Sequence, residues 1–272
     1  MAGYPATMRA PAHYEYTGLM AQSWDLLRGD TSAWPDRAFY LEVIRRHGQP
    51  VLDVGCGTGR LLLDFLAQGI DVDGVDNSPE MLALLREKAR VAGLQPRVYE
   101  QPMEALSLPR RYRTILIPSS SLQLVTDVAA AGAALRGMRS LLPEGGVLVA
   151  PFMTLWHEGQ PLESGRETRA VRPADGAVFR RIEKCRFDPA NGCEHTEDRY
   201  EVIVDGRVVG EETHRRSPAT RSYTQEEARR LFLEAGFAEV TVTSGFRLVA
   251  AKADDLLFCV TALDSRARPG IS

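Results

Sequence analysis

The chain has 272 residues with a formal net charge of -3, and 44% of its residues are hydrophobic and 25% charged. These values are ordinary for globular proteins, so one large α/β domain with an inserted lobe can bury a sizeable core. The slight acidity argues against a nucleic-acid binder, which normally carries a basic surface. The four cysteines form no C-x-x-C pair, so neither a disulfide framework nor a metal site is expected.

The chain lacks the apolar segments that membrane insertion or export requires. No run of about 18 apolar residues is present to span a bilayer. The first 12 residues contain no apolar core of signal-peptide length. We therefore expect no membrane contact and a cytoplasmic location.

Alternating helix and strand patterns dominate the first part of the chain. Residues 1–47 are expected to form an N-terminal helical cap, because apolar residues recur at helical spacing over 36–47. Strands are predicted at 51–54, 70–75, 97–100, 112–118 and 146–152, and helices at 59–68, 79–92 and 127–142. Ser78 and Pro79 are typical of an N-cap followed by a first-turn proline. Such alternation predicts a doubly wound parallel sheet, with ligands beyond the carboxyl ends of its strands.

The pattern changes after Pro151, where strand-like segments follow one another without helices. Turn residues at 188–192 and 205–206 separate these segments, so residues 155–217 are predicted to form an inserted antiparallel β lobe. Its arginines are balanced by glutamates, which favours a solvated strand face over an anion-binding site. A capping box at 224–227 starts another helix, and strands near 237–246 and 256–263 follow. Residues 48–154 and 218–272 would then form the main domain.

A glycine-rich turn follows the first predicted strand, which carries an acidic residue, Asp53. Gly55, Gly57 and Gly59 alternate there and would let the backbone approach a ligand closely. The free N–H groups of the next helix favour an anionic group. Asp76 ends the second strand, where a carboxylate can bind a ribose diol. Together these features favour a nucleoside-type cofactor.

The spacing of the glycines distinguishes between nucleoside cofactors. A dinucleotide turn follows G-x-G-x-x-G, and counted from Gly55 its third glycine would stand where this chain has Arg60. That departure argues against a nicotinamide-dependent oxidoreductase. The pattern D-x-G-x-G-x-G, followed by Asp76, Asn77 and Met81, instead closely resembles class I S-adenosylmethionine-dependent methyltransferases. The resemblance implies S-adenosylmethionine as cofactor and a seven-stranded, mostly parallel sheet that ends in an antiparallel hairpin.

Within that family, the chain is most similar to the small-molecule branch, such as glycine and aminosugar N-methyltransferases. Asp53 would order the turn or reach the methionine amino group through water, and Asp76 would accept hydrogen bonds from both ribose hydroxyls. Trp24 stands where the branch often has a tyrosine that closes over the cofactor. The full cofactor set implied by the resemblance is Trp24, Asp53, Gly55, Cys56, Gly57, Thr58, Gly59, Asp76, Asn77, Met81, Met103, Glu104, Pro118 and Ser119.

The chain departs from the branch at two positions. Pro102 stands where an acid usually reaches the adenine amine, so either Glu104 substitutes for it or that hydrogen bond is missing. In the loop after the fourth strand Gln123 is kept, whereas Leu124 replaces a histidine that would help orient or deprotonate an acceptor.

Three residues are candidates for the acceptor side of the site. Gln123 lies in a loop expected to border the methyl group, and His157 follows the functional end of the fifth strand. Tyr16 could cap the site from the N-terminal segment. The alternatives are an exposed loop histidine at 157 and a tyrosine that only anchors a helix on the core.

These features predict methyl transfer by in-line displacement to a small-molecule acceptor, with an amine favoured. A neutral amine can attack first and lose its proton later, so it tolerates a missing general base. A catalytically inactive binder of S-adenosylmethionine or S-adenosylhomocysteine remains an alternative, as does an O-methyltransferase. The sequence leaves open the acceptor, the methylated atom and the choice between monomer and homodimer.

Overall fold

The computed structural model describes residues 15–265, so the first 14 residues of the predicted N-terminal cap lie outside the described part. Two helices open that part, α1 (Gly18–Arg28) and α2 (Pro35–His47). No helix within residues 15–265 has the length and apolar character needed to cross a bilayer.

The main domain is built on a seven-stranded sheet with the order β10-β11-β5-β4-β1-β2-β3. The strands β1 to β5 pair in parallel, whereas β11 runs antiparallel to both β5 and β10. This arrangement confirms the predicted doubly wound sheet with a closing hairpin. The strands are β1 (Val51–Val54), β2 (Val72–Asp76), β3 (Arg97–Glu100), β4 (Thr114–Leu116), β5 (Val147–Met153), β10 (Glu239–Ser244) and β11 (Leu257–Leu263).

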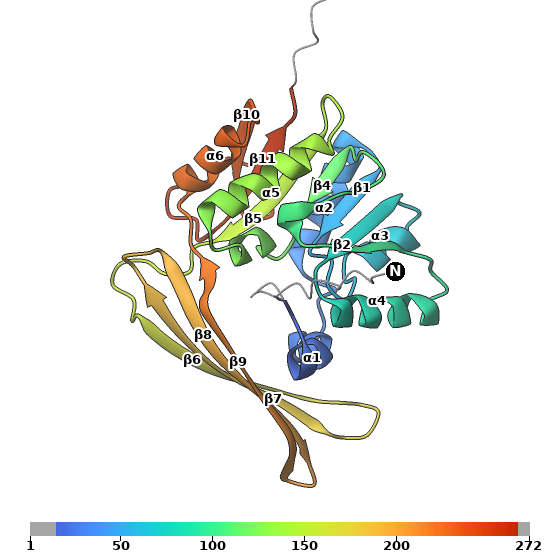
Figure 1. Ribbon diagram of the computed structural model, residues 1–272, viewed down its shortest axis with the longest axis vertical. Coiled ribbons are helices and arrows are strands. Elements are labelled where there is room, and N and C mark those ends of the chain that lie inside the picture. Colours follow the sequence, from blue (N-terminus) through green and yellow to red (C-terminus); the bar gives the residue numbers. More distant parts are fainter. Residues whose placement is uncertain (1–14, 266–272) are drawn as a thin grey trace, which may run out of the picture.

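Helices cover both faces of this sheet (Figure 1). Leu52 and Val54 of β1 belong to one hydrophobic cluster, with side chains of α5 and α6, whereas Val51 belongs to a second cluster with α2 and α3. Since neighbouring residues of a strand point to opposite faces, the two clusters are the two sides of one core. The remaining helices are α3 (Leu62–Ala67), α4 (Pro79–Val91), α5 (Val128–Ser140) and α6 (Gln225–Glu234), with short 3₁₀ turns η1 (Met103–Ala105) and η2 (Ser121–Leu124).

Capping residues act as the sequence predicts. The Ser78 hydroxyl accepts a hydrogen bond from the N–H of Met81 at 3.1 Å and starts α4. Thr224 and Glu227 form a reciprocal capping box at the start of α6. In contrast, α3 begins at Leu62, later than the expected residue 59, because the glycine turn occupies the residues before it.

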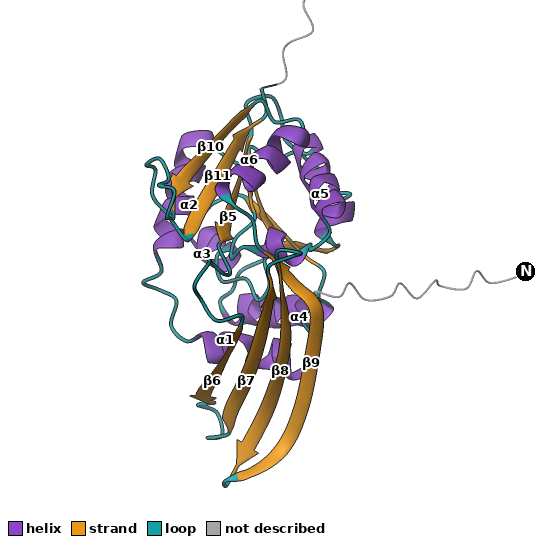
Figure 2. Ribbon diagram, turned by 90° about the vertical axis from the view of Figure 1, so that its left-hand side faces the viewer, coloured by secondary structure: helices purple, strands orange, loops and turns teal. Residues whose placement is uncertain are grey.

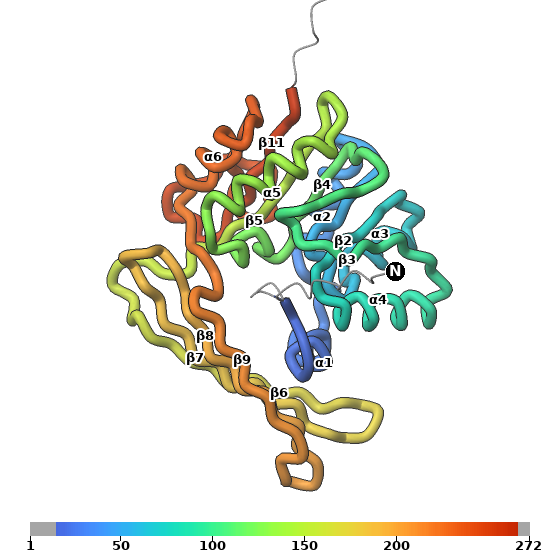
Figure 3. The backbone as a smooth tube through the Cα atoms, viewed as in Figure 1, coloured from blue at the N-terminus to red at the C-terminus, as the bar shows by residue number. Residues whose placement is uncertain are grey.

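A separate four-stranded antiparallel sheet forms the inserted lobe, in the order β6-β7-β8-β9. The chain leaves the main domain after β5 and returns through β9, as the backbone trace shows (Figure 3). The sheet is long and curved and extends away from the main domain (Figure 2). Its strands are β6 (Glu163–Val171), β7 (Val178–Asp188), β8 (Cys193–Val204) and β9 (Arg207–Arg221).

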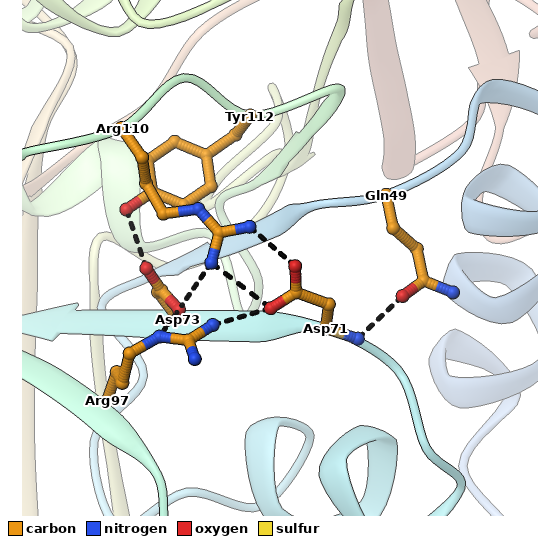
Figure 4. A network of polar contacts seen from close by, with 6 residues as sticks. All are labelled: Gln49, Asp71, Asp73, Arg97, Arg110 and Tyr112. Atoms are coloured by element: carbon orange, nitrogen blue, oxygen red, sulfur yellow. Dashed lines mark hydrogen bonds and ion pairs between the residues drawn. The ribbon is translucent and has the colours of Figure 1, made fainter.

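A charge network around the buried carboxylate of Asp73 fixes the amino end of β2, away from the edge at which the parallel strands end (Figure 4). The Asp73 side chain is fully buried and accepts hydrogen bonds from the Tyr112 hydroxyl at 2.9 Å and from Arg97 Nε at 2.7 Å. Arg110 and Arg97 also pair with Asp71. The network joins β2, β3 and the segment before β4, and a buried carboxylate requires such donors.

Tyr112→Phe should lower the free energy of unfolding by about 1–3 kcal/mol, because it removes a donor from a buried carboxylate. Urea unfolding of the variant measures this loss, and ligand affinity should be unchanged because the network lies at the opposite edge of the sheet. Tyr99→Phe is the matched control, since its hydroxyl makes no bond to Asp73. Equal stability of Tyr112→Phe and the wild type would contradict the prediction.

Candidate functional site

A pocket lies at the carboxyl edge of the parallel sheet, where β1, β2 and β4 end. Its wall consists of the glycine turn, the end of β2, the segments after β3 and β4, and α1. The lining residues are Tyr16, Trp24, Arg28, Asp53, Val54, Gly55, Cys56, Gly57, Thr58, Arg60, Leu61, Val75, Asp76, Asn77, Met81, Gln101, Met103, Pro118, Ser119, Ser121 and Leu124.

The glycine turn is held tightly against β2. The N–H groups of Gly55 and Cys56 both donate to the carbonyl of Val75, at 2.8 and 3.1 Å. Gly57 has a φ of +54°, and an added Cβ there would lie 3.3 Å from the methyl carbon of Met81. Only glycine takes this backbone conformation without strain, and the absent side chain leaves the turn open to the pocket.

Asp53 brings a buried carboxylate to the floor of the pocket. Asp53 is 1% exposed, and its Oδ1 has no hydrogen-bond partner among the described residues. Burial raises the pKa of Asp53 to about 7; nearby Arg60 opposes this rise and Asp76 adds to it. An unpartnered acceptor that lines a pocket fits a ligand that supplies a donor, such as an ammonium group.

Asp76 and Asn77 form the neighbouring part of the wall. Asp76 Oδ2 accepts from the N–H of Gly57 at 2.8 Å and its Oδ1 from the N–H of Ser78 at 2.9 Å. Burial raises the pKa of Asp76, although these backbone hydrogen bonds oppose the rise. Each carboxylate oxygen keeps a further lone pair. The buried Nδ2 of Asn77 has no partner, so this wall offers a ligand both acceptors and a donor.

The outer wall comes from α1 and the segment that follows it. The Arg28 guanidinium lies 4.9 Å from the ring centre of Trp24 and 4.7 Å from that of Trp34, and donates to the Ser119 hydroxyl at 3.0 Å. Burial and then nearby Arg60 lower the pKa of Arg28. Within residues 15–265 no carboxylate forms an ion pair with Arg28. A half-buried cation without a counter-ion marks this wall as suited to an anionic ligand group.

Arg60 occupies the position that a dinucleotide turn would fill with glycine. It forms a nearly buried ion pair with Asp36 of α2, and its guanidinium lies 5.0 Å from the ring centre of Trp34. Its side chain therefore links the glycine turn to α2.

A second, larger chamber adjoins the first and has a volume of about 710 Å³. Trp24, Arg28 and Ser119 line both spaces. The chamber lies between α1, the ends of β4 and β5, and one face of the lobe, to which the register partners Thr168, Arg181 and Tyr200 belong. Its other residues are Met20, Ser23, Leu27, Trp34, Asp36, Ser120, Pro151, Met153, Arg166, Phe246 and Leu257.

Most residues predicted from the sequence meet at the first pocket, and four do not. Twelve of the fourteen predicted cofactor residues line it, together with Tyr16. Gly59 instead faces Leu85 and Leu63, and Glu104 lies in η1 outside the lining.

His157 and Gln123 also lie away from the pocket. His157 is exposed in a separate groove beside Tyr223 and Asp254. Gln123 is fully buried, and its amide group is bound to backbone at both ends: Nε2 donates to the carbonyls of Met153 and Arg221, and Oε1 accepts from the N–H of Met153. This side chain joins the end of β5 to the end of β9.

Sequence reasoning missed several chamber residues. These residues reach the chamber from four separate parts of the chain, and they are Arg28, Trp34, Arg181, Tyr200 and Phe246. No local motif marks them, because their convergence depends on how the lobe and α1 pack. The alternation of side chains along β7 and β8 could have predicted that Arg181 and Tyr200 share one face of the lobe sheet. It could not have predicted which face covers the site.

Comparison with known proteins places most of the pocket lining within a matched domain. Residues 51–146 match the family model described as a methyltransferase domain. The chain is 28% identical over 230 residues to the dTDP-3-amino-3,6-dideoxy-alpha-D-glucopyranose N,N-dimethyltransferase of Streptomyces fradiae, covering 82% of this chain and 86% of that protein. It is 27% identical over 248 residues to a glycine/sarcosine N-methyltransferase of Parasynechococcus marenigrum, covering 87% and 81%.

Solved structures share the fold along nearly the whole chain. A sugar N-methyltransferase of Streptoalloteichus superposes with a TM-score of 0.70 at 22% identity, covering 98% of this chain and 99% of that one. A S-adenosylmethionine-dependent methyltransferase of Clostridium acetobutylicum gives 0.69 at 18% identity, covering 89% and 96%. The matched domain, the relatives that span most of the chain and the shared fold together identify the chain as a class I S-adenosylmethionine-dependent methyltransferase of the small-molecule type.

Proposed function

We propose that this methyltransferase methylates the nitrogen of an amine-bearing small molecule held in the chamber between α1 and the lobe. The observation that carries the proposal is the junction of the two spaces at Trp24, Arg28 and Ser119. A volume of about 710 Å³ lies within the roughly 300–1,000 Å³ of small-molecule sites. The N-methyltransferase names of the two relatives favour an amine acceptor.

The first pocket offers acceptors and a donor that suit the amino group and the ribose of the cofactor. When bound, S-adenosylmethionine supplies a methyl group already activated by its sulfonium. Asp53 would hold the amino group, and Asp76 would accept from the ribose hydroxyls while Asn77 donates to the ligand from the same wall. Arg28 would face an anionic group at the junction. Orientation of this kind supplies much of the rate in such displacements, roughly 7–11 kcal/mol in favourable intramolecular models.

The chamber offers no ready general base, which supports an amine over a hydroxyl. Among its described lining residues there is no histidine, and the one carboxylate, Asp36, is paired with Arg60. Burial raises the pKa of Tyr200, so this hydroxyl keeps its proton. A neutral amine needs no proton removal before attack, whereas a hydroxyl does.

The direct test incubates the protein with S-adenosylmethionine and paired amine and hydroxyl analogues, including aminosugars and their hydroxy counterparts. Mass spectrometry should find methylation on nitrogen only, with kcat/KM rising as the pH deprotonates the acceptor amine. Methylation of a hydroxyl analogue in place of its amine would make the protein an O-methyltransferase. Tight S-adenosylhomocysteine binding without transfer to any acceptor would favour the inactive binder.

Asp76→Ala should weaken binding of S-adenosylhomocysteine by about 1–3 kcal/mol, because two ribose hydroxyls would lose a buried acceptor. Isothermal titration calorimetry measures the change. Glu100→Ala, at the exposed end of the neighbouring strand β3, is the matched control and should bind normally. Unchanged affinity in a folded Asp76→Ala protein would reject the ribose assignment.

Asp53 should make cofactor affinity depend on pH. Because its pKa is raised to about 7, the carboxylate is protonated below that pH and loses its attraction for an ammonium group. The dissociation constant should rise as the pH falls from about 8 to 6, by up to tenfold per unit, and Asp53→Asn should remove this dependence.

The same ionisation affects stability in the opposite direction. The pKa of Asp53 is higher in the folded state than the value of about 3.9 expected in the unfolded chain. The carboxyl therefore stabilises the fold at pH values below about 3.9, and this stabilisation is lost as the pH rises through about 7. The difference in unfolding free energy between wild type and Asp53→Asn should follow this course. If cofactor affinity and the free energy of unfolding changed in the same direction with pH, the assignment of Asp53 would be contradicted.

A further inference from the structure

The amino end of α1 lacks the usual caps of a helix. Its N-cap residue, Thr17, makes no side-chain hydrogen bond, and its first turn contains no acidic residue. The first N–H groups of a helix need acceptors, and the positive end of its dipole favours carboxylates. These acceptors must therefore come from elsewhere in the chain.

Two glutamates from opposite sides of the site supply them. Glu80, at the start of α4 in the main domain, accepts from the N–H of Gly18 at 2.8 Å. Glu212, in β9 of the lobe, accepts from the N–H of Leu19 at 2.7 Å. The same Oε2 of Glu212 lies 3.3 Å from Nε2 of His214. The start of α1 is thus held between the cofactor domain and the lobe.

Gly18 allows this close approach. An added Cβ at Gly18 would lie 2.2 Å from Oε2 of Glu212, and its φ of +56° is unfavourable for other residues. A side chain at residue 18 would therefore displace the carboxylate from the helix end.

The rest of α1 covers the cofactor pocket. Asp25 accepts from the Thr58 hydroxyl at 2.6 Å and pairs with Lys88, while Arg28 reaches Ser119. Beneath α1, the pocket has a free volume of only about 120 Å³, below the roughly 300 Å³ of the smallest typical ligand sites. Because α1 supplies part of this wall, an outward shift of α1 would widen the pocket for a nucleoside-sized ligand.

We propose that Glu212 is a positioning residue that keeps α1 closed over the cofactor, so that the acceptor lobe controls how long the cofactor stays bound. The inference rests on the cofactor assignment above. Glu212 lines neither of the two spaces and acts through the helix end alone. When the lobe moves on acceptor binding or product release, this carboxylate transmits the movement to α1.

The test measures dissociation of S-adenosylhomocysteine by surface plasmon resonance. Glu212→Ala should raise koff about tenfold, which corresponds to ~1.4 kcal/mol. Glu212→Gln, which keeps an acceptor but loses the charge, should give a smaller increase. Single-turnover rates at saturating S-adenosylmethionine should stay close to wild type while the KM for this cofactor rises. Glu211→Ala, on the opposite strand face, is the matched control and should leave koff unchanged.

Gly18→Ala provides a second route to the same contact. As a single substitution it should raise koff. In the Glu212→Ala background it should raise koff by less than in the wild type, because the carboxylate that it displaces is already absent.

The possible outcomes distinguish the cofactor assignment from the proposed role of Glu212. A wild-type protein that binds no S-adenosylhomocysteine would overturn the cofactor assignment. Normal wild-type binding with an unchanged koff in folded Glu212→Ala would overturn only the role of Glu212. A drop in melting temperature without any change in koff would likewise assign Glu212 a purely structural role.

Discussion

Asp53 lies buried and Asp76 partly buried at the carboxyl ends of neighbouring parallel strands, and within residues 15–265 neither takes part in an ion pair. Taking a carboxylate out of water is unfavourable unless hydrogen bonds replace the lost hydration. The backbone of the glycine turn and of Ser78 does this for Asp76, whereas Oδ1 of Asp53 remains unpartnered. The parallel sheet thus holds the site with one buried acceptor left open, which fits the cofactor contacts proposed above.

The position of α1 links this edge to the lobe. The helix packs against α4 and all four lobe strands, and its residues Trp24 and Arg28 separate the two spaces. One short helix therefore forms a wall of both sites. A small movement of α1 would change the shape of both spaces together, since packed elements shift as units.

The sequence predicted the fold and most of the lining of the first pocket, because both depend on local signals. Strand periodicity, the glycine spacing and the cap at Ser78 are short-range features that the chain carries whatever its tertiary context. The lining of the second chamber was predicted less fully, because Arg28, Arg181 and Tyr200 meet only through the packing of α1 on the lobe. Gln123 shows the same limit, since its loop borders the site while its side chain points into the protein to bind backbone.

The buried amide of Gln123 has a consequence for how this enzyme can change its substrate. It holds the end of β5 beside the end of β9, the two points at which the chain leaves and re-enters the main domain. With both points fixed by one side chain, the two ends of the lobe keep their places on the main domain even where the strands between them change in sequence. A different lobe grafted between residues 154 and 221 would therefore begin and end at fixed points, and it would have to carry a carboxylate in place of Glu212 to keep the contact with α1.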